Sequence, residues 1–196
     1  MSTGPDHQAP YPLPKHEFLA GRIALDFCNS LSRCAGPGPR DRALQPKDFL
    51  AWADRYGQAL DRAPSPATLA RLHRLRAALL GIFDALNDGG TPPADDLAVL
   101  NEELAAARTA ERLRSGQGGF ALEDRAATPV DRFRNAVARD AADLLLDDPR
   151  RIKRCPNHEC LWLFYDGSKN LSRRWCAMDD CGTKDKVRRF RRRKSD

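Results

Sequence analysis

Four cysteines near the C-terminus place the strongest constraint on how this chain can fold. Cys155 and Cys160 form one pair, and Cys176 and Cys181 form a second, each pair with four residues between its members. Fifteen residues separate the two pairs. Zinc binds four soft ligands in a tetrahedron, and two short-spaced pairs on two local turns can supply them. The spacing therefore predicts one structural Zn²⁺ ion, with reduced thiol pairs or disulfides as the alternatives.

A zinc ion held by four thiolates has no open position for a water molecule. Such a site builds structure and does not activate a hydroxide, which argues against hydrolytic or deaminase chemistry. His158 lies inside the first pair, and with four cysteines available we expect it to be a bystander. Glu159 is assigned no catalytic role. Since the rest of the chain offers no nucleophile–base pair or phosphate loop, we expect that the protein is not an enzyme.

The cellular setting follows from what the sequence lacks. No apolar run approaches the roughly 18–20 residues that a membrane helix needs. The N-terminus carries neither the basic nor the apolar region of a secretory signal, and residues 1–16, rich in proline and polar groups, are expected to be a disordered tail. We therefore expect a cytoplasmic protein without a membrane partner, in which disulfides are disfavoured. Cys28 and Cys34 flank a short loop and could coordinate a metal, but we expect them to be buried or idle thiols.

Charge is distributed unevenly along the chain, whose formal net charge is +6. Residues 150–196 hold fifteen Lys and Arg against six Asp and Glu, whereas the remaining 149 residues hold eighteen against twenty-one. A basic module attached to a slightly acidic body favours a polyanionic partner such as a nucleic acid. The alternative interpretation is a solvated basic tail.

The body, residues 17–149, has the pattern of one mainly helical domain. Ser65-Pro66 and Thr128-Pro129 are typical helix starts, and Asp88-Gly89 is a typical stop. The apolar spacing predicts a short strand within 21–31, where Ile23, Leu25 and Phe27 alternate, helices over about 46–60, 66–87, 94–112 and 129–147, and a short strand at 120–122.

Residues 150–196 are predicted to form a small finger around the metal. The run LWLFYD (161–166) is a strand candidate leaving the first cysteine pair, and Asp185 begins a basic, helix-like run. The second pair would then lie at the N-terminus of that helix, where the backbone dipoles favour a negative zinc–thiolate cluster. Trp162, Phe164 and Trp175 can shelter the metal in a unit too small for a core of its own.

Residues 150–196 contain several short elements at fixed spacing: Cys155…Cys160, Trp162-x-Phe164, Asp166-x-Ser168-x-Asn170, Arg173-Arg174-Trp175-Cys176-x-Met178, Cys181-Gly182-Thr183-Lys184 and Lys186. Together these elements resemble the CGNR-type zinc finger family. The chain departs from the family pattern at Thr183 and Lys184, where the family has Asn and Arg. Lysine keeps the positive charge but loses the bidentate hydrogen bonding of arginine.

The segment GRIALDFCNSL (21–31) resembles the opening of the ABATE domain, which usually precedes this finger, through Leu25, Asp26, Asn29 and Ser30. A helix containing Phe49, Leu50 and Trp52 also fits. The resemblance implies a mainly α fold with minor β structure, in which a helical sensor or regulatory domain (17–149) precedes a four-cysteine zinc finger (150–196) built from a β-hairpin and a helix, treble-clef or ribbon-like. It also implies a stress-induced bacterial transcription regulator that binds DNA.

Three functions are compared on these grounds. The first is a zinc-dependent DNA-binding regulator whose body senses a small-molecule effector or forms a homodimer. The second is an RNA-binding or ribosome-associated module, in which exposed Trp162, Tyr165 and Trp175 would stack on bases. The third is a protein-interaction adaptor that docks on an acidic partner.

Two groups of contact residues are predicted for the first function. Asp26 and Asn29, polar residues among apolar neighbours, are candidate effector ligands, although bracing the following loop is the simpler role. The candidate nucleic-acid contacts are Arg173, Arg174, Lys184, Lys186, Arg188, Arg189, Arg191, Arg192 and Arg193.

Overall fold

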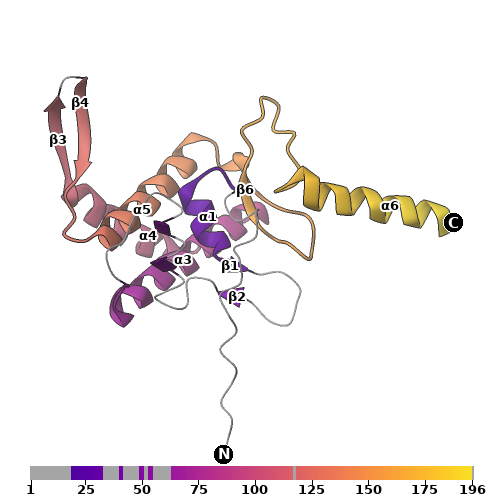
Figure 1. Cartoon of the computed structure of the whole chain (residues 1–196), viewed down its shortest axis with the longest axis horizontal. Coiled ribbons are helices and arrows are strands. Elements are labelled where there is room, and N and C mark those ends of the chain that lie inside the picture. The colour runs from indigo at the N-terminus through magenta and orange to yellow at the C-terminus, as the bar shows by residue number, and fades with distance from the viewer. Residues whose placement is uncertain are drawn as a thin grey trace, which may run out of the picture.

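The computed structural model describes residues 19–32, 40–41, 49–50, 53–54, 63–116 and 118–195. The predicted N-terminal tail, most of the predicted 46–60 helix and Cys34 lie outside these residues. The helical body consists of α1 (Ile23–Asn29), α3 (Pro66–Asn87), α4 (Ala94–Ala110) and α5 (Pro129–Asp147), which pack together in Figure 1. No helix in the described part of the chain has the length and apolar character needed to cross a membrane.

The predicted caps start two of these helices. The Ser65 hydroxyl accepts a hydrogen bond from the N–H of Thr68 at 3.2 Å, and Pro66 occupies the first turn of α3. The Thr128 hydroxyl accepts from the N–H of Asp131 at 3.1 Å at the start of α5. Each cap satisfies a donor that the first turn of a helix leaves free, and it confirms the predicted start of that helix. Both helices also end at the predicted residues, Asn87 and Asp147.

Aromatic rings fill the centre of the body. Phe27 and Phe49 each meet Phe133 edge to face, with ring centroids 5.5 and 5.3 Å apart. The same core contains five fully buried leucine and isoleucine side chains from α3 and α5, namely Leu72, Leu75, Leu79, Ile82 and Leu144. Side chains from segments far apart in sequence thus form one core, as the helical periodicity predicts.

The prediction of a strand within 21–31 is wrong, because this segment forms helix α1. All six side chains from Ala24 to Asn29 are buried. A short helix enclosed on every side has no polar face, so its apolar residues show no helical period. Asp140 of α5 holds its start, accepting from the N–H of Ala24 at 2.9 Å and from Arg22 at 2.7 Å.

The region after α4 also differs from the prediction. The helix ends at Ala110, and a β-hairpin follows, formed by β3 (Glu111–Gly116) and β4 (Gly119–Asp124). The predicted strand at 120–122 is therefore the centre of a longer one. A minor two-stranded pair, β1 (Leu31–Ser32) with β2 (Arg40–Asp41), follows α1.

The C-terminal finger contains a short hairpin and a long helix. A 3₁₀ turn, η1 (Pro149–Arg151), leads into β5 (Ile152–Arg154), which pairs antiparallel with β6 (Leu163–Tyr165). A wide turn, η2 (Met178–Gly182), then leads into α6 (Thr183–Ser195), which begins two residues before the predicted Asp185. In Figure 1 α6 extends away from the body into solvent.

Two asparagines connect the hairpin of the finger to the helical body. Asn29, the last residue of α1, donates to the carbonyl of Leu163 at 2.8 Å and accepts from its N–H at 2.9 Å. Asn87, the last residue of α3, accepts from the N–H of Arg154 at 2.7 Å and donates to the carbonyl of Ile152 at 3.2 Å. Each amide therefore pairs with one outer edge of the hairpin as a neighbouring strand would.

The hairpin also contributes side chains to both parts of the molecule. Ile152 and Leu163 belong to the core of the body, whereas Phe164 packs among the four cysteines. Successive residues of a strand point to opposite faces, so three-residue strands can serve two cores at once. The finger and the helical body therefore form a single packed unit.

We predict that Asn87→Ala lowers the free energy of unfolding of the zinc-loaded protein by about 2 kcal/mol, because two main-chain groups of β5 lose their partner. Urea denaturation followed by circular dichroism at 222 nm measures this. The control is Asn101→Ala, an exposed asparagine on α4, which should change stability by less than about 0.5 kcal/mol. Equal midpoints for the two variants would show that the Asn87 amide does not stabilise the hairpin.

Candidate metal centre

The four predicted cysteines lie together and are buried. Their sulfur atoms all lie within 4.8 Å of one another, with Cys160 and Cys176 at 3.5 Å and Cys176 and Cys181 at 3.7 Å. A tetrahedron of sulfurs at about 2.3 Å from zinc has edges of about 3.8 Å. The donor set and its spacing thus fit one Zn²⁺ ion. His158 is exposed and does not join the cluster, and Cys28 lies in the core of the body.

Main-chain hydrogen bonds shape the first cysteine pair into a tight turn between β5 and β6. The N–H of Cys155 donates to the carbonyl of Trp162 at 2.7 Å, and the N–H of Cys160 donates to the carbonyl of Asn157 at 2.7 Å. Leu161 has a φ of 58°, in the left-handed region that most side chains avoid. This strained residue reverses the chain so that both sulfurs face the same point.

The second pair lies where η2 leads into α6. Cys181 is within η2, and its sulfur accepts a hydrogen bond from the buried side-chain amide of Asn157 at 3.4 Å. This contact connects the two cysteine turns directly. Cys181 also lies in the first turn of the continuous helical segment that η2 and α6 form, where the helix dipole favours the negative charge of a metal-bound thiolate.

Electrostatics favour a cation among four thiols that lie this close together. Hydrogen bonds from Cys160 and Cys176 lower the pKa of Cys155 well below its usual value. The hydrogen bond to Cys155 raises the pKa of Cys160, and burial raises it further. The cluster alone therefore favours one thiolate and disfavours more, because like charges repel at this separation. A divalent cation at the centre removes that repulsion.

Gly182 follows the last ligand at a point that Met178 covers closely, so a side chain here would force the Met178 thioether to move. A Cβ atom built at this position would lie 2.5 Å from the sulfur of Met178 and 3.3 Å from the ring of Trp175. Thr183 and Lys184, which depart from the family pattern, have local partners. The Thr183 hydroxyl donates to the carbonyl of Met178 at 3.1 Å, and Lys184 forms an ion pair with Asp180 at 2.8 Å.

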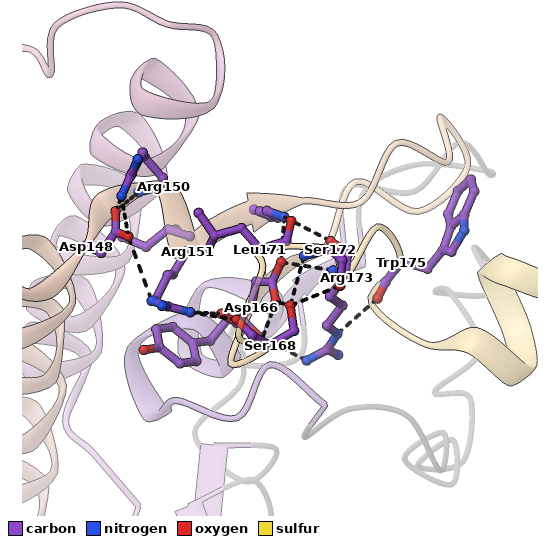
Figure 2. A network of polar contacts seen from close by, with 12 residues as sticks. Asp148, Arg150, Arg151, Asp166, Ser168, Leu171, Ser172, Arg173 and Trp175 are labelled. Carbon is purple, nitrogen blue, oxygen red and sulfur yellow. Dashed lines mark hydrogen bonds and ion pairs between the residues drawn. The ribbon is translucent and has the colours of Figure 1, made fainter.

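A buried carboxylate organises the loop between the two cysteine turns (Figure 2). Asp166 accepts from the N–H and the hydroxyl of Ser168 at 2.9 and 2.5 Å, from Lys153 at 2.5 Å, and from the N–H of Arg173 at 3.0 Å. Burial raises the pKa of Asp166, but the hydrogen bonds from Lys153 and Ser168 outweigh it and hold the pKa below its usual range. The loop motif Asp166-x-Ser168 is therefore structural.

Arg173, predicted as a nucleic-acid contact, is bound by main-chain groups in the structure. Its guanidinium donates to four main-chain carbonyls and stacks 4.7 Å from the ring centroid of Phe164. These bonds hold the second cysteine turn against β6 and the start of the body, and they leave the group poorly placed to meet a phosphate. The four carbonyls belong to Leu19, Tyr165, Trp175 and Cys176.

The other predicted basic contacts are exposed on or near α6. Arg174 lies 5.8 Å from the Trp175 ring, and Arg188 and Arg189 both pair with Asp185. Lys186, Arg192 and Arg193 are exposed and make no ion pair with any described residue. Arg191 lines an open groove between α6 and the first cysteine turn, together with Asn157, Glu159, Thr183, Lys184, Val187 and Arg188.

The two candidate effector ligands are occupied by the protein itself. Asp26 accepts from the N–H of Ala20 at 3.1 Å, and Asn29 pairs with Leu163 as described above. Both side chains are buried. They therefore brace neighbouring segments, which matches the simpler of the two roles considered for them. Lys153 and Asn87 were missed, since nothing in their local sequence marks a partner so far along the chain.

We predict that the protein binds one zinc ion per chain and that Cys176→Ser lowers zinc affinity by at least tenfold, because one thiolate ligand is lost. Titration against a chromogenic zinc chelator measures both. Tryptophan fluorescence should change on zinc removal, since Trp162 and Trp175 pack on the cluster. Cys28→Ala is the control and should keep one zinc; equal zinc affinity in the Cys176 and Cys28 variants would contradict this ligand set.

We predict that Asp166→Asn lowers the free energy of unfolding by about 2 kcal/mol, because Lys153 and three further donors lose a charged acceptor. Chemical denaturation at pH 7 measures the loss, with exposed Asp179→Asn as the control. Since the folded pKa of Asp166 lies below the ordinary value of about 3.9, its contribution is complete above that pH and is lost only in stronger acid. A stability gap between wild type and variant that is already closed at pH 5 would contradict this.

Comparison with known families supports the same division of the chain. The ABATE family, described as "putative stress-induced transcription regulator", matches residues 21–148, and the CGNR zinc finger matches residues 151–194. A search of curated proteins finds no match. Since the first family covers more than half of the chain and the second covers the cysteine cluster, this protein belongs to the ABATE family and ends in a CGNR zinc finger.

Proposed function

We propose that this protein is a non-enzymatic transcription regulator that binds DNA through its C-terminal helix. The observation that carries the proposal is the placement of α6. This helix is basic and exposed along its length, and the cysteine cluster at its start fixes it to the body. An α-helix has the width that the major groove of B-DNA admits.

The charge on α6 suits a phosphate backbone. The helix carries eight Lys and Arg and a single acid, Asp185. Asp185 holds Arg188 and Arg189 on one side, which leaves Lys186, Arg192 and Arg193 as cations exposed to a polyanion without a competing carboxylate among the described residues. Each phosphate that such a cation neutralises releases counterions, so binding is expected to weaken steeply with salt.

The aromatic side chains support DNA over RNA. Stacking on unpaired bases needs open ring faces. Trp162 and Trp175 instead pack against the cysteine cluster, and Arg22 lies 5.6 Å from the ring centroid of Tyr165, whose hydroxyl bonds to Asp147. All three rings are half-buried, so less of each face is open to an unpaired base than on a free ring. Displacement by RNA in the test below would indicate RNA binding, and the absence of any nucleic-acid binding is what docking on an acidic protein predicts.

We predict that the triple variant Lys186→Ala, Arg192→Ala, Arg193→Ala weakens binding to duplex DNA. The slope of log K against log salt should fall in magnitude by about 3, since three phosphate contacts are lost. Fluorescence anisotropy of labelled duplex, measured with zinc-loaded protein over a salt series, gives the slope. Unlabelled single-stranded RNA serves as a competitor in the same titration.

The matched control removes three exposed arginines from the body, as Arg74→Ala, Arg112→Ala, Arg125→Ala. Both triple variants lose three positive charges, so a difference between their salt slopes would reflect direct contacts of α6 with DNA and not the net charge of the protein. Equal slopes would indicate a diffuse charge effect and argue against α6 as the contact. Wild-type protein that binds no duplex at low salt would refute the proposal, and stronger displacement by RNA would replace DNA with RNA.

A further inference from the structure

The β3–β4 hairpin carries an uncovered apolar face. Leu113, Phe120 and Leu122 are 67%, 78% and 62% exposed, and among the large apolar side chains described in the body only Leu146 is more exposed than all three. The strand register places Leu113 opposite Leu122 and Ser115 opposite Phe120, so the three apolar side chains share one face. In Figure 1 this hairpin projects from the body at the end remote from α6.

The base of the hairpin is firmly held. Asp124 accepts from Asn135 at 3.0 Å and from Arg139 at 2.9 Å, both on α5. Burial raises the pKa of Asp124, but hydrogen bonds from the main chain of Ala126, from Arg139 and from Asn135 outweigh it and lower the pKa. On the opposite face of the strands, Arg114 forms an ion pair with Glu123. The apolar face is thus presented by an anchored element, although a two-stranded hairpin alone is marginally stable in water.

The direction of the main-chain groups follows from one hydrogen bond at this base. The N–H of Arg125 donates to the carbonyl of Ala110 at 2.9 Å. Along an antiparallel strand the main-chain N–H and C=O groups of successive residues point alternately toward one neighbouring strand and away from it. Ala121 is four residues before Arg125, so its main-chain groups also point toward β3. The main-chain groups of Phe120 and Leu122 therefore point outward and form an open strand edge.

We propose that this edge binds a second copy of the chain, with the two β4 strands antiparallel and centred on Ala121. Phe120 of each copy then lies opposite Leu122 of the other, and their outward main-chain groups pair. The result is a four-stranded sheet in which six apolar side chains form one continuous patch. Aromatic–aliphatic pairs across strands stabilise such sheets.

Charge selects the β4 edge over the β3 edge. With β4 centred on Ala121, Glu123 lies opposite Gly119, and no like charges meet. Two β3 strands centred on Leu113 would place Arg112 of one copy opposite Arg114 of the other, which is unfavourable for directly facing residues. A register centred on either arginine would place that residue opposite itself. A register centred on Ser115 avoids these contacts but pairs only residues 114–116 of each β3 strand, whereas β4 centred on Ala121 pairs residues 119–123 without opposing like charges. The β4 edge is therefore more complementary to itself than the β3 edge.

The test is a cross-link at the proposed two-fold axis. Ala121 would face its own copy as a non-hydrogen-bonded pair, with Cα atoms about 4.5 Å apart, within the range of a disulfide. Zinc-loaded Ala121→Cys should form a covalent dimer under mild oxidation. Arg114→Cys is the matched control: it lies on the same face of the hairpin but on the outer strand of the sheet, too far from its counterpart to react.

Sedimentation velocity of the protein without nucleic acid supplies the second measurement. Wild type should dimerise, and Leu122→Lys should raise the dimer dissociation constant at least tenfold while leaving the monomer folded, because this side chain is already exposed. Monomeric wild type at about 100 μM, or equal cross-linking of the two cysteine variants, would overturn the proposal. Neither measurement involves DNA, so failure here leaves the proposed DNA binding untouched.

Discussion

The structure depends on the pairing of a very short hairpin with two asparagine amides. Strands of three residues cannot stabilise themselves in water, and their outer edges would lose hydrogen bonds to solvent on burial. Asn29 and Asn87, at the ends of two helices, satisfy those edges from either side. The hairpin can then place Leu163 in the helical core and Phe164 beside the cysteines.

The finger extends this arrangement by electrostatic means. Its cations fall into two groups with different tasks. Lys153 and Arg173 are turned inward, where a buried carboxylate and main-chain carbonyls hold them and fix the loop between the cysteine turns. The cations of α6 face solvent. The inward cations hold the loop between the two cysteine turns, whereas the outward ones remain exposed.

The sequence allowed much of this to be predicted. The four cysteines, the caps of α3 and α5 and the basic terminal helix could be predicted because each depends on residues that lie close together in the sequence. Helix α1 was missed because burial on all sides removes its period. The main-chain contacts of Arg173 were not foreseen, because an arginine that donates to carbonyls looks the same in sequence as one that meets a phosphate. The asparagine pairs bridge 134 and 65 residues, a separation that no local pattern reports.

The shared hairpin has a consequence for how such proteins can evolve. A small zinc-binding domain that folds around its own metal can be moved between genes by recombination without losing its structure. In this protein, separating the chain at residue 150 would remove the Asn29 and Asn87 side chains from the two edges of the hairpin. It would also expose Ile152 and Leu163, which belong to the core of the body. Recombination at that boundary is therefore penalised, so the helical body and its finger are expected to descend together as one heritable unit.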